Sequence, residues 1–244
     1  MIGDAAPPAR RSRSSPPLPV AFYARETEHV ARDLLGAVLE CRSPAGVTAG
    51  RIVETEAYVG EHDLACHAAA GRTARTEPLY GPPGIAYVYF IYGMYWCFNA
   101  VTRQRHEPSA VLVRAVEPVA GVDLMRERRP RVRRDVDLTN GPGKLCIALG
   151  ICREHNGLRL QRAPLVIRPG VPVPDDDVTV TPRIGISQSA DWPLRWFVTG
   201  NPYVSRTPPH FPRVTLGASV RDGKTTAGPS RPAVVERHHR KDSR

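Results

Sequence analysis

The sequence predicts one compact domain of the α+β class, built on a largely antiparallel, curved sheet with helices around it. Strand-like and short helical segments are interspersed, and few segments are long enough for the helical crossovers of a parallel sheet. A chain of 244 residues, 41% of them hydrophobic, can bury one substantial core. No internal repeat divides it further.

Two terminal segments differ in composition from the expected core, which covers residues 20–205. Residues 1–19 hold five prolines and three arginines but few apolar side chains. Burial therefore cannot repay the entropy of ordering them, and we expect a disordered extension. Residues 206–244 end in the basic run ERHHRK. We expect a disordered tail there, either solvated or in weak, non-specific contact with nucleic acid.

Local patterns predict the individual elements. Val30, Leu34 and Leu35 recur at helical spacing, and Gly36 suits the end of that helix. The other elements follow from apolar alternation and from turns that contain glycine. Strands are expected over residues 37–41, 50–58, 165–167, 183–186 and 195–199, a hairpin over 85–101 that turns near Tyr92-Gly93-Met94-Tyr95, and helices over 119–128 and from 140–144 to Gly150.

The formal net charge of +10 favours an anionic partner, because a positive field attracts polyphosphates from a distance. All but three of the 34 basic residues are arginines, however, and genomic base composition would produce the same bias. A cluster of six arginines between residues 126 and 134 is open to both interpretations, as DNA contact or as surface loop. Basicity therefore favours nucleic acid without deciding the matter.

The cysteines and the apolar segments indicate a cytoplasmic protein. Five cysteines without a CxxC pair argue against a disulfide framework. The N-terminus lacks the apolar stretch of a signal peptide. The longest apolar segment, residues 85–101, is interrupted by Gly93 and Asn99, so we expect no membrane span.

Aromatic residues concentrate in the expected hairpin, where residues 85–101 hold seven of the sixteen in the chain. On a strand, Tyr87 and Tyr89 point to one face, and Phe90 and Tyr92 to the other. Two interpretations remain open. The rings form a tyrosine-rich core hairpin, or one face stacks on nucleic-acid bases, at ~1–3 kcal/mol per base.

Two carboxylates lie close together at the end of an expected strand. Glu54, Glu56 and Tyr58 share a face if no bulge intervenes. Such a pair could perform acid/base chemistry at a glycosidic bond. Either carboxylate could equally be an ion-pair partner for Arg51 or Arg114. Spacing alone does not choose between the two glutamates.

A third candidate site is the segment His62-Asp63-Leu64-Ala65-Cys66-His67, which resembles a set of metal ligands. The separation of His62 and His67 is not the i, i+4 spacing of a zinc helix, and no second ligand cluster follows. The spacing therefore argues against a metal site in this segment.

Five motifs along the chain are more specific than any of these features. They are RIVETEAYVGEHDLACHA, GPPGIAYVYFIYGMYWCFNAV, VLVRAVEP, NGPGKLCIALGI and LRWFVTGNPYVS, and they fall within residues 20–205. In this order they resemble the alkyladenine (3-methyladenine) DNA glycosylase family. The resemblance implies a hairpin that enters the DNA minor groove, and a hydrolase that needs no metal, cofactor or covalent intermediate. It implies a monomeric, nucleoid-associated bacterial enzyme that acts on damaged purines in double-stranded DNA.

The resemblance implies that Glu56 is the general base that holds and deprotonates water, with Arg114 beside it. Cleavage of an N-glycosidic bond builds positive charge on the sugar, which an ionised carboxylate stabilises. A neighbouring guanidinium favours the ionised form of Glu56, which suits a base rather than an acid. Alkylated purines that already carry a positive charge can leave without an acid.

The same motifs imply a base pocket. Tyr58 and Tyr89 correspond to the aromatic walls that sandwich the flipped base, with cation–π attraction for a cationic one. His67 corresponds to the histidine that hydrogen-bonds the purine edge, which displaces its interpretation as a metal ligand. Asn99 corresponds to the asparagine that disfavours the amino group of normal guanine. Tyr80, where phenylalanine is more usual, would place a hydroxyl near the rim and change which lesions fit.

Two further features would contact the DNA itself. Tyr92, assisted by Met94, corresponds to the wedge that fills the gap left by the flipped nucleotide. Gly143 and Lys144 open a helix whose free N–H groups would accept a phosphate, or form only a capping turn. Some family members have serine at the position of Gly143, which weakens a backbone contact here.

The expected product is an abasic site in an intact strand. Nicking usually needs an amine nucleophile, and Lys144 is the only lysine of the expected core. The expected substrates are 3-methyladenine, 7-methylguanine, hypoxanthine and ethenoadenine. Two alternatives remain: a non-catalytic nucleic-acid-binding protein, and a hydrolase of nucleosides or sugars that uses Glu54 and Glu56.

Overall fold

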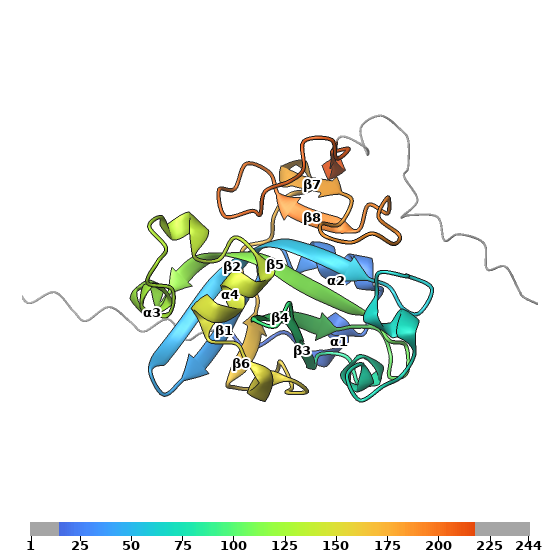
Figure 1. Cartoon of the computed structure of the whole chain (residues 1–244), viewed down its shortest axis with the longest axis horizontal. Helices are drawn as coiled ribbons and strands as arrows, with labels where there is room; N and C mark the ends of the chain where they lie inside the picture. Colours follow the sequence, from blue (N-terminus) through green and yellow to red (C-terminus); the bar gives the residue numbers. More distant parts are fainter. Residues whose placement is uncertain (1–14, 218–244) are drawn as a thin grey trace, which may run out of the picture.

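The computed structural model describes residues 15–217, and their strands form one open, curved antiparallel sheet, which confirms the expected α+β class (Figure 1). The strand order is β3-β4-β5-β2-β8-β7-β9, and β1 pairs with β2 and β6. The strands are β1 (Val38–Ser43), β2 (Gly46–Tyr58), β3 (Ala86–Ile91), β4 (Tyr95–Val101), β5 (Ala110–Ala120), β6 (Leu165–Arg168), β7 (Val178–Thr181), β8 (Arg195–Val198) and β9 (Val214–Thr215).

Short helices surround this sheet. Helix α2 packs against β2, where the hydroxyl of Thr55 donates a hydrogen bond to the carbonyl of Ala31 at 2.8 Å. Helix α4 packs against β4, beside the hairpin. The α-helices are α1 (Val20–Tyr23), α2 (Thr27–Asp33), α3 (Val122–Arg128) and α4 (Pro142–Leu149), and the 3-10 helices are η1 (His67–Ala70), η2 (Glu77–Tyr80), η3 (Asp135–Asp137), η4 (Arg153–His155) and η5 (Asp175–Asp177).

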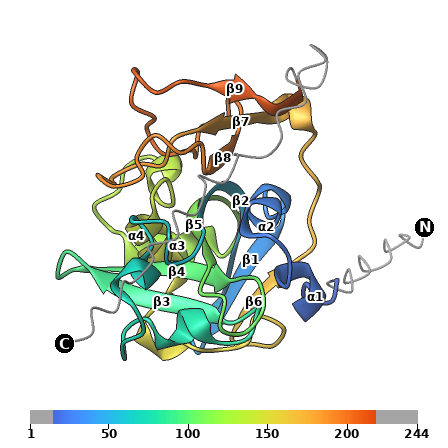
Figure 2. The same ribbon diagram turned by 90° about the vertical axis from the view of Figure 1, so that its right-hand side faces the viewer.

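The long strands β2 and β5 pair through the middle of the sheet and divide it into two sides. The hairpin of β3 and β4 lies on one side, and β8, β7 and β9 lie on the other (Figure 2). A large apolar core fills the interior, and a smaller cluster, with Tyr80, Tyr87 and Ala110 among its members, lies beneath the hairpin. Tyr58 and Tyr89 pack on this smaller cluster, which supports the pocket described below.

Several expected elements are confirmed. Gly36 has a φ of +87° after helix α2, as a C-terminal glycine requires. The expected hairpin is β3 and β4, paired in register from Ala86 opposite Ala100 to Ile91 opposite Tyr95. Helix α4 follows Gly141 and ends at Gly150, whose φ is +78°.

The expected strand at residues 183–186 is wrong. The strand lies upstream, at β7, and stops before Pro182, which has no N–H to donate to a ladder. Residues 183–186 form a loop instead, with a left-handed Gly185. The expected helix over 119–128 begins only at Val122, because residues 119 and 120 end β5.

The described structure extends beyond residues 20–205 at both ends. The amide of Leu18 donates to the carbonyl of Ile167 at 2.8 Å, and β9 pairs with β7. The rest of the two expected disordered segments, residues 1–14 and 218–244, lies outside the described residues. Within residues 15–217, no helix has the length and apolarity needed to cross a membrane.

Candidate active site

A cavity of about 470 Å³ opens between the hairpin, strand β5, the start of α4 and the loop at residues 184–186. Most of the residues singled out from the sequence line it, whereas Glu56 and Met94 do not. The lining residues are Tyr58, Ala65, Cys66, His67, Leu79, Tyr87, Tyr89, Ile91, Tyr92, Tyr95, Cys97, Asn99, Ala110, Leu112, Arg114, Gly141, Pro142, Gly143, Lys144, Ile184, Gly185 and Ile186.

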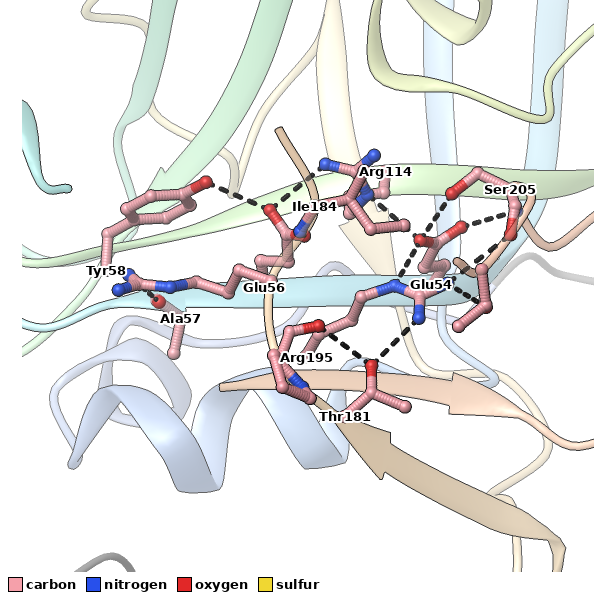
Figure 3. A network of polar contacts seen from close by, with 12 residues as sticks. Glu54, Glu56, Ala57, Tyr58, Arg114, Thr181, Ile184, Arg195 and Ser205 are labelled. Carbon is pink, nitrogen blue, oxygen red and sulfur yellow. Dashed lines mark hydrogen bonds and ion pairs between the residues drawn. The ribbon is translucent and has the colours of Figure 1, made fainter. Parts of the chain in front are cut away.

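Glu56 lies fully buried directly behind the wall of this cavity. Its Oε1 accepts a hydrogen bond from the backbone amide of Ile184 at 2.7 Å. Its Oε2 accepts from the hydroxyl of Tyr58 at 2.9 Å and from Nη1 of Arg114 at 3.1 Å (Figure 3). Tyr58, Arg114 and Ile184 all line the cavity, so within residues 15–217 every donor to this carboxylate borders the space where a ligand would lie.

Arg114 connects the two glutamates. Its Nε donates to Oε1 of Glu54 at 2.9 Å while its Nη1 reaches Glu56 (Figure 3). The register of β2 against β5 shifts on both sides of Glu54, so that Ala115 and Val113 have partners in β2 and Arg114 has none. Such bulges redirect a side chain. The strand therefore does bulge here, and both carboxylates nevertheless contact the same guanidinium.

Glu54 is saturated by donors from other elements. Its carboxylate also accepts from Nε of Arg195 and from the amide and hydroxyl of Ser205, each at 2.7 Å (Figure 3). Burial alone would raise the pKa of Glu54, but the charges of Arg114 and Arg195 and the bonds from Ser205 hold that pKa below its usual value. Glu54 is therefore an ionised anchor for two arginines and does not line the cavity. Arg51, the other expected partner, pairs with Glu117 instead.

Further aromatic rings line the cavity. The ring of Tyr89 lies 4.4 Å from that of His67 and 5.3 Å from that of Tyr87, centroid to centroid. Nδ1 of His67 lies 2.8 Å from the hydroxyl of Tyr87. Burial, together with the charge of Arg75, lowers the pKa of His67 to about 4, so this imidazole is neutral at neutral pH. Asn99 donates through Nδ2 to the carbonyl of Tyr87 at 3.1 Å.

The hairpin tip projects apolar side chains into solvent. Tyr92 is 76% exposed and Met94 is 61% exposed. Tyr92 and Gly93 have φ values of +53° and +67°, and the amide of Met94 donates to the carbonyl of Ile91. These two left-handed residues begin the three-residue loop between the paired residues Ile91 and Tyr95. The turn therefore holds a large tyrosine in a backbone conformation that favours glycine or asparagine.

Gly143 has a packing role at the start of α4. A Cβ at this position would lie 2.9 Å from the side chain of Tyr95. Its absence lets the hairpin approach the helix closely. Nζ of Lys144 donates to Oδ1 of Asn140 at 2.7 Å, so its ammonium bonds the loop just before its own helix.

Tyr80 is not among the residues that line the cavity. Its hydroxyl donates to Oε1 of Glu61 at 2.8 Å, and the guanidinium of Arg72 lies 5.4 Å from its ring centroid. The preceding residue, Leu79, lines the cavity instead.

The candidate metal ligands separate in the structure. His67 contacts Tyr87, His62 packs near Trp192, and Asp63 forms a buried ion pair with Arg183. Within residues 15–217, no three potential ligands come together as a metal site.

Most of the arginine cluster at residues 126–134 is engaged within the fold. Arg126 pairs with Asp123 and Asp135, and Arg134 pairs with Asp137. Two others donate to backbone carbonyls. Arg128 donates to the carbonyl of Ala148, near the end of α4, and Arg129 donates to the carbonyls of residues 137 and 138. Arg131 and Arg133 are exposed. Four of the six arginines therefore hold this surface segment in place through ion pairs and hydrogen bonds.

The sequence analysis missed Arg183, Arg195, Ile184 and Ser205, which all contact the two glutamates or their neighbours. One pattern could have found two of them. An arginine within an otherwise apolar, strand-like stretch, as in TVTPRIGI and PLRWFV, indicates a buried charge that needs a partner. The backbone donors Ile184 and Ser205 leave no such trace, because an amide has no sequence identity.

Comparison with known proteins extends the resemblance over most of the chain. The family model of methylpurine-DNA glycosylases matches residues 21–202. A relative from Myxococcus xanthus is 51% identical over 195 residues, which cover 79% of this chain and 95% of the relative. A relative from Methanocella arvoryzae is 46% identical over 80% of this chain and 98% of its own, and one from Salinibacter ruber is 48% identical over 79% and 98%. All three are provisionally named 3-methyladenine DNA glycosylases.

Proposed function

The chain belongs to the methylpurine-DNA glycosylase family, and on this premise we propose that Glu56 activates the water that removes alkylated or deaminated purines from duplex DNA. It is a DNA-repair hydrolase that acts on damaged bases of the 3-methyladenine type. The observation that carries the proposal is the carboxylate of Glu56, which is buried behind a tyrosine-lined cavity. Among the described residues, its three hydrogen-bond donors all border that cavity.

The hydrogen-bond capacity of Glu56 leaves one acceptor position unused. An ionised carboxylate accepts about four hydrogen bonds, and Glu56 receives three from Tyr58, Arg114 and Ile184. Because Glu56 is fully buried, we propose that a lining side chain moves aside when DNA binds, so that a water from the cavity takes this position and faces C1′ of the flipped nucleotide. As the bond from C1′ to the purine nitrogen breaks, its electrons leave with the base. The water oxygen bonds to C1′ and gives its proton to Glu56.

Arg114 would hold the carboxylate of Glu56 in place for this step. Its Nη1 donates a charge-assisted hydrogen bond to Oε2 of Glu56 at 3.1 Å. Glu54 would hold the opposite edge of the same guanidinium in place, because its Oε1 bonds Nε of Arg114. We therefore propose that Glu56 is the base and that Glu54 positions Arg114.

The walls of the cavity suit a flat purine. Tyr58 and Tyr89 would lie against its faces and attract a cationic, alkylated ring by cation–π interaction. Burial raises the pKa of Tyr87 to about 12, so its hydroxyl stays protonated and can donate to Nδ1 of His67. A neutral His67 would then carry its proton on Nε2, and we propose that it donates to an acceptor on the purine edge. Asn99 would crowd the amino group of normal guanine.

The proposed specificity covers 3-methyladenine, 7-methylguanine, hypoxanthine and ethenoadenine. We expect the protein to release each free base from a duplex that carries one lesion, and to leave the strand intact until alkali is added. Nζ of Lys144, the only lysine within residues 15–217, is engaged by Asn140, which argues against an amine nucleophile. Chromatography of the bases and denaturing gels of the strand measure the two outcomes. Failure to release any of the four would contradict the proposal. Strand breaks without alkali that disappear in Lys144→Ala would contradict a monofunctional enzyme.

Tyr92→Ala is expected to weaken binding to a lesion-containing duplex by about tenfold or more, because the wedge offsets an unstacking cost of a few kcal/mol. The side chain is 76% exposed, so the fold should be unaffected. Fluorescence anisotropy with labelled duplexes measures the effect. Val171→Ala, an equally exposed position before β7, serves as the control. Equal affinity of Tyr92→Ala and wild type would remove the wedge from the proposal.

A further inference from the structure

A buried ion pair outside the proposed catalytic groups connects two loops that border the cavity. Arg183 and Asp63 are both fully buried, and they form two parallel bonds: Nη1 to Oδ2 at 2.5 Å and Nη2 to Oδ1 at 2.8 Å. Bidentate pairs of this kind fix the orientation of both partners as well as their distance.

On its own side of the pair, Asp63 shapes the loop that leads to His67. Its Oδ2 accepts from the amide of Val59 at 3.2 Å, and its Oδ1 accepts from the amide of Ala65 at 3.1 Å. One carboxylate therefore holds the segment from the end of β2 almost to the start of η1. His67, which lines the cavity, begins that 3-10 helix.

On the other side, Arg183 lies against the residues that surround Glu56. Its Nη1 also donates to the carbonyl of Ala57 at 3.0 Å, and its guanidinium carbon lies 4.7 Å from the ring centroid of Tyr58. The next residue, Ile184, donates its amide to Glu56. Residues 183–186 belong to no strand, so no sheet ladder sets the position of this amide.

We propose that Arg183 is a positioning residue. Through its ion pair with Asp63, it holds the Ile184 amide and the Tyr58 ring where they can donate hydrogen bonds to Glu56. The proposal rests on the assignment of Glu56 as the base. Two of the three donors to Glu56 depend on Arg183: the Ile184 amide through the chain, and the Tyr58 hydroxyl through the stacked ring. The same ion pair orders the approach to His67, so base recognition and water activation are set by one contact.

The variant Arg183→Lys tests whether the shape of the Arg183 side chain matters in addition to its positive charge. Lysine keeps a cation beside Asp63, but its ammonium lacks the planar fork and the flat face that stacks on Tyr58. A displacement of about 1 Å at a reacting group can cost about 100-fold in rate. We expect single-turnover base release to slow by about 10- to 100-fold, while the dissociation constant for the lesion duplex stays within about threefold.

The matched control is Arg168→Lys, which makes the same change in a partly buried pair with Glu40 on β1 and β6, outside the cavity lining. It should leave the rate of base release unchanged. Thermal melting of both variants separates loss of fold from loss of position. Equal rates for Arg183→Lys and wild type, or a loss in rate matched by an equal loss in the control, would overturn the proposal.

Asp63→Asn provides a second variant if Arg183→Lys does not fold. It keeps the size of the side chain and removes the charge, and it should show the same loss of rate at nearly constant affinity. If neither variant folds, the pair serves folding and the positioning role is wrong. Absence of base release by the wild type would instead contradict the proposed function itself, so the two failures are distinguishable.

Discussion

Glu56→Gln is expected to bind a lesion-containing duplex like the wild type and to release its base about 100- to 10,000-fold more slowly, the usual contribution of a general base. Glutamine keeps the size of the side chain but removes the charge. Both carboxylate oxygens accept hydrogen bonds from donors, namely Ile184 on one side and Tyr58 and Arg114 on the other. In either orientation, the side-chain NH2 group of glutamine therefore faces another hydrogen-bond donor and cannot bond to it.

Single-turnover kinetics and binding, measured on the same duplex, test this expectation. Glu117→Gln is the matched control, because Glu117 lies on β5 in a half-exposed pair with Arg51. Its base release should equal that of the wild type. Full activity of Glu56→Gln together with loss of activity in Glu54→Gln would identify Glu54 as the general base instead.

Arg114→Met is expected to destabilise the protein by about 3–5 kcal/mol, because it leaves buried carboxylates without their shared counter-charge. Arg195 still contacts Glu54, but within residues 15–217 no ion pair other than that with Arg114 reaches Glu56. The variant should therefore also be inactive. Urea unfolding at pH 7 measures the stability. A change below about 1 kcal/mol, the usual value for a surface pair, would contradict the assigned burial.

The same substitution has an expected pH dependence. The pKa of Glu54 lies below its usual value in the fold, so Glu54 stabilises the protein above about pH 4.5 and loses this contribution as the pH falls further. Removing Arg114 reduces that contribution. The difference in unfolding free energy between wild type and variant should therefore be full at pH 7 and smaller at pH 4. A difference in unfolding free energy that grows as the pH falls would contradict this expected pH dependence.

Local sequence patterns predicted the elements that are determined by residues close together in the chain. The hairpin followed from the apolar stretch at residues 85–101 and from the turn at Gly93, and α2 followed from apolar spacing and Gly36. The central strand β5 was not among the expected strands, although its VLVRAVEP segment appeared in the family resemblance. Residues 183–186 were expected as a strand, yet they form a loop in which Arg183 makes a buried ion pair with Asp63, 120 positions earlier in the chain.

The candidate site was only partly predictable for the same reason. Spacing brought Glu54 and Glu56 to one face, but it could not show that Arg195 and Ser205 saturate Glu54. That distinction depends on β8 and on the segment after it, which meet β2 only in the folded chain. Long-range pairing therefore decides which glutamate is free to act, and no local pattern encodes it.

The most direct test of the proposed function is the release of 7-methylguanine by the wild-type protein from two substrates at equal concentration. One is a duplex that carries a single lesion, and the other is the free nucleoside. We expect rapid release from the duplex and little from the nucleoside, because the tip residue Tyr92 can act as a wedge only in DNA. Release from the nucleoside alone would indicate a nucleoside hydrolase, and release from neither would contradict the proposed chemistry.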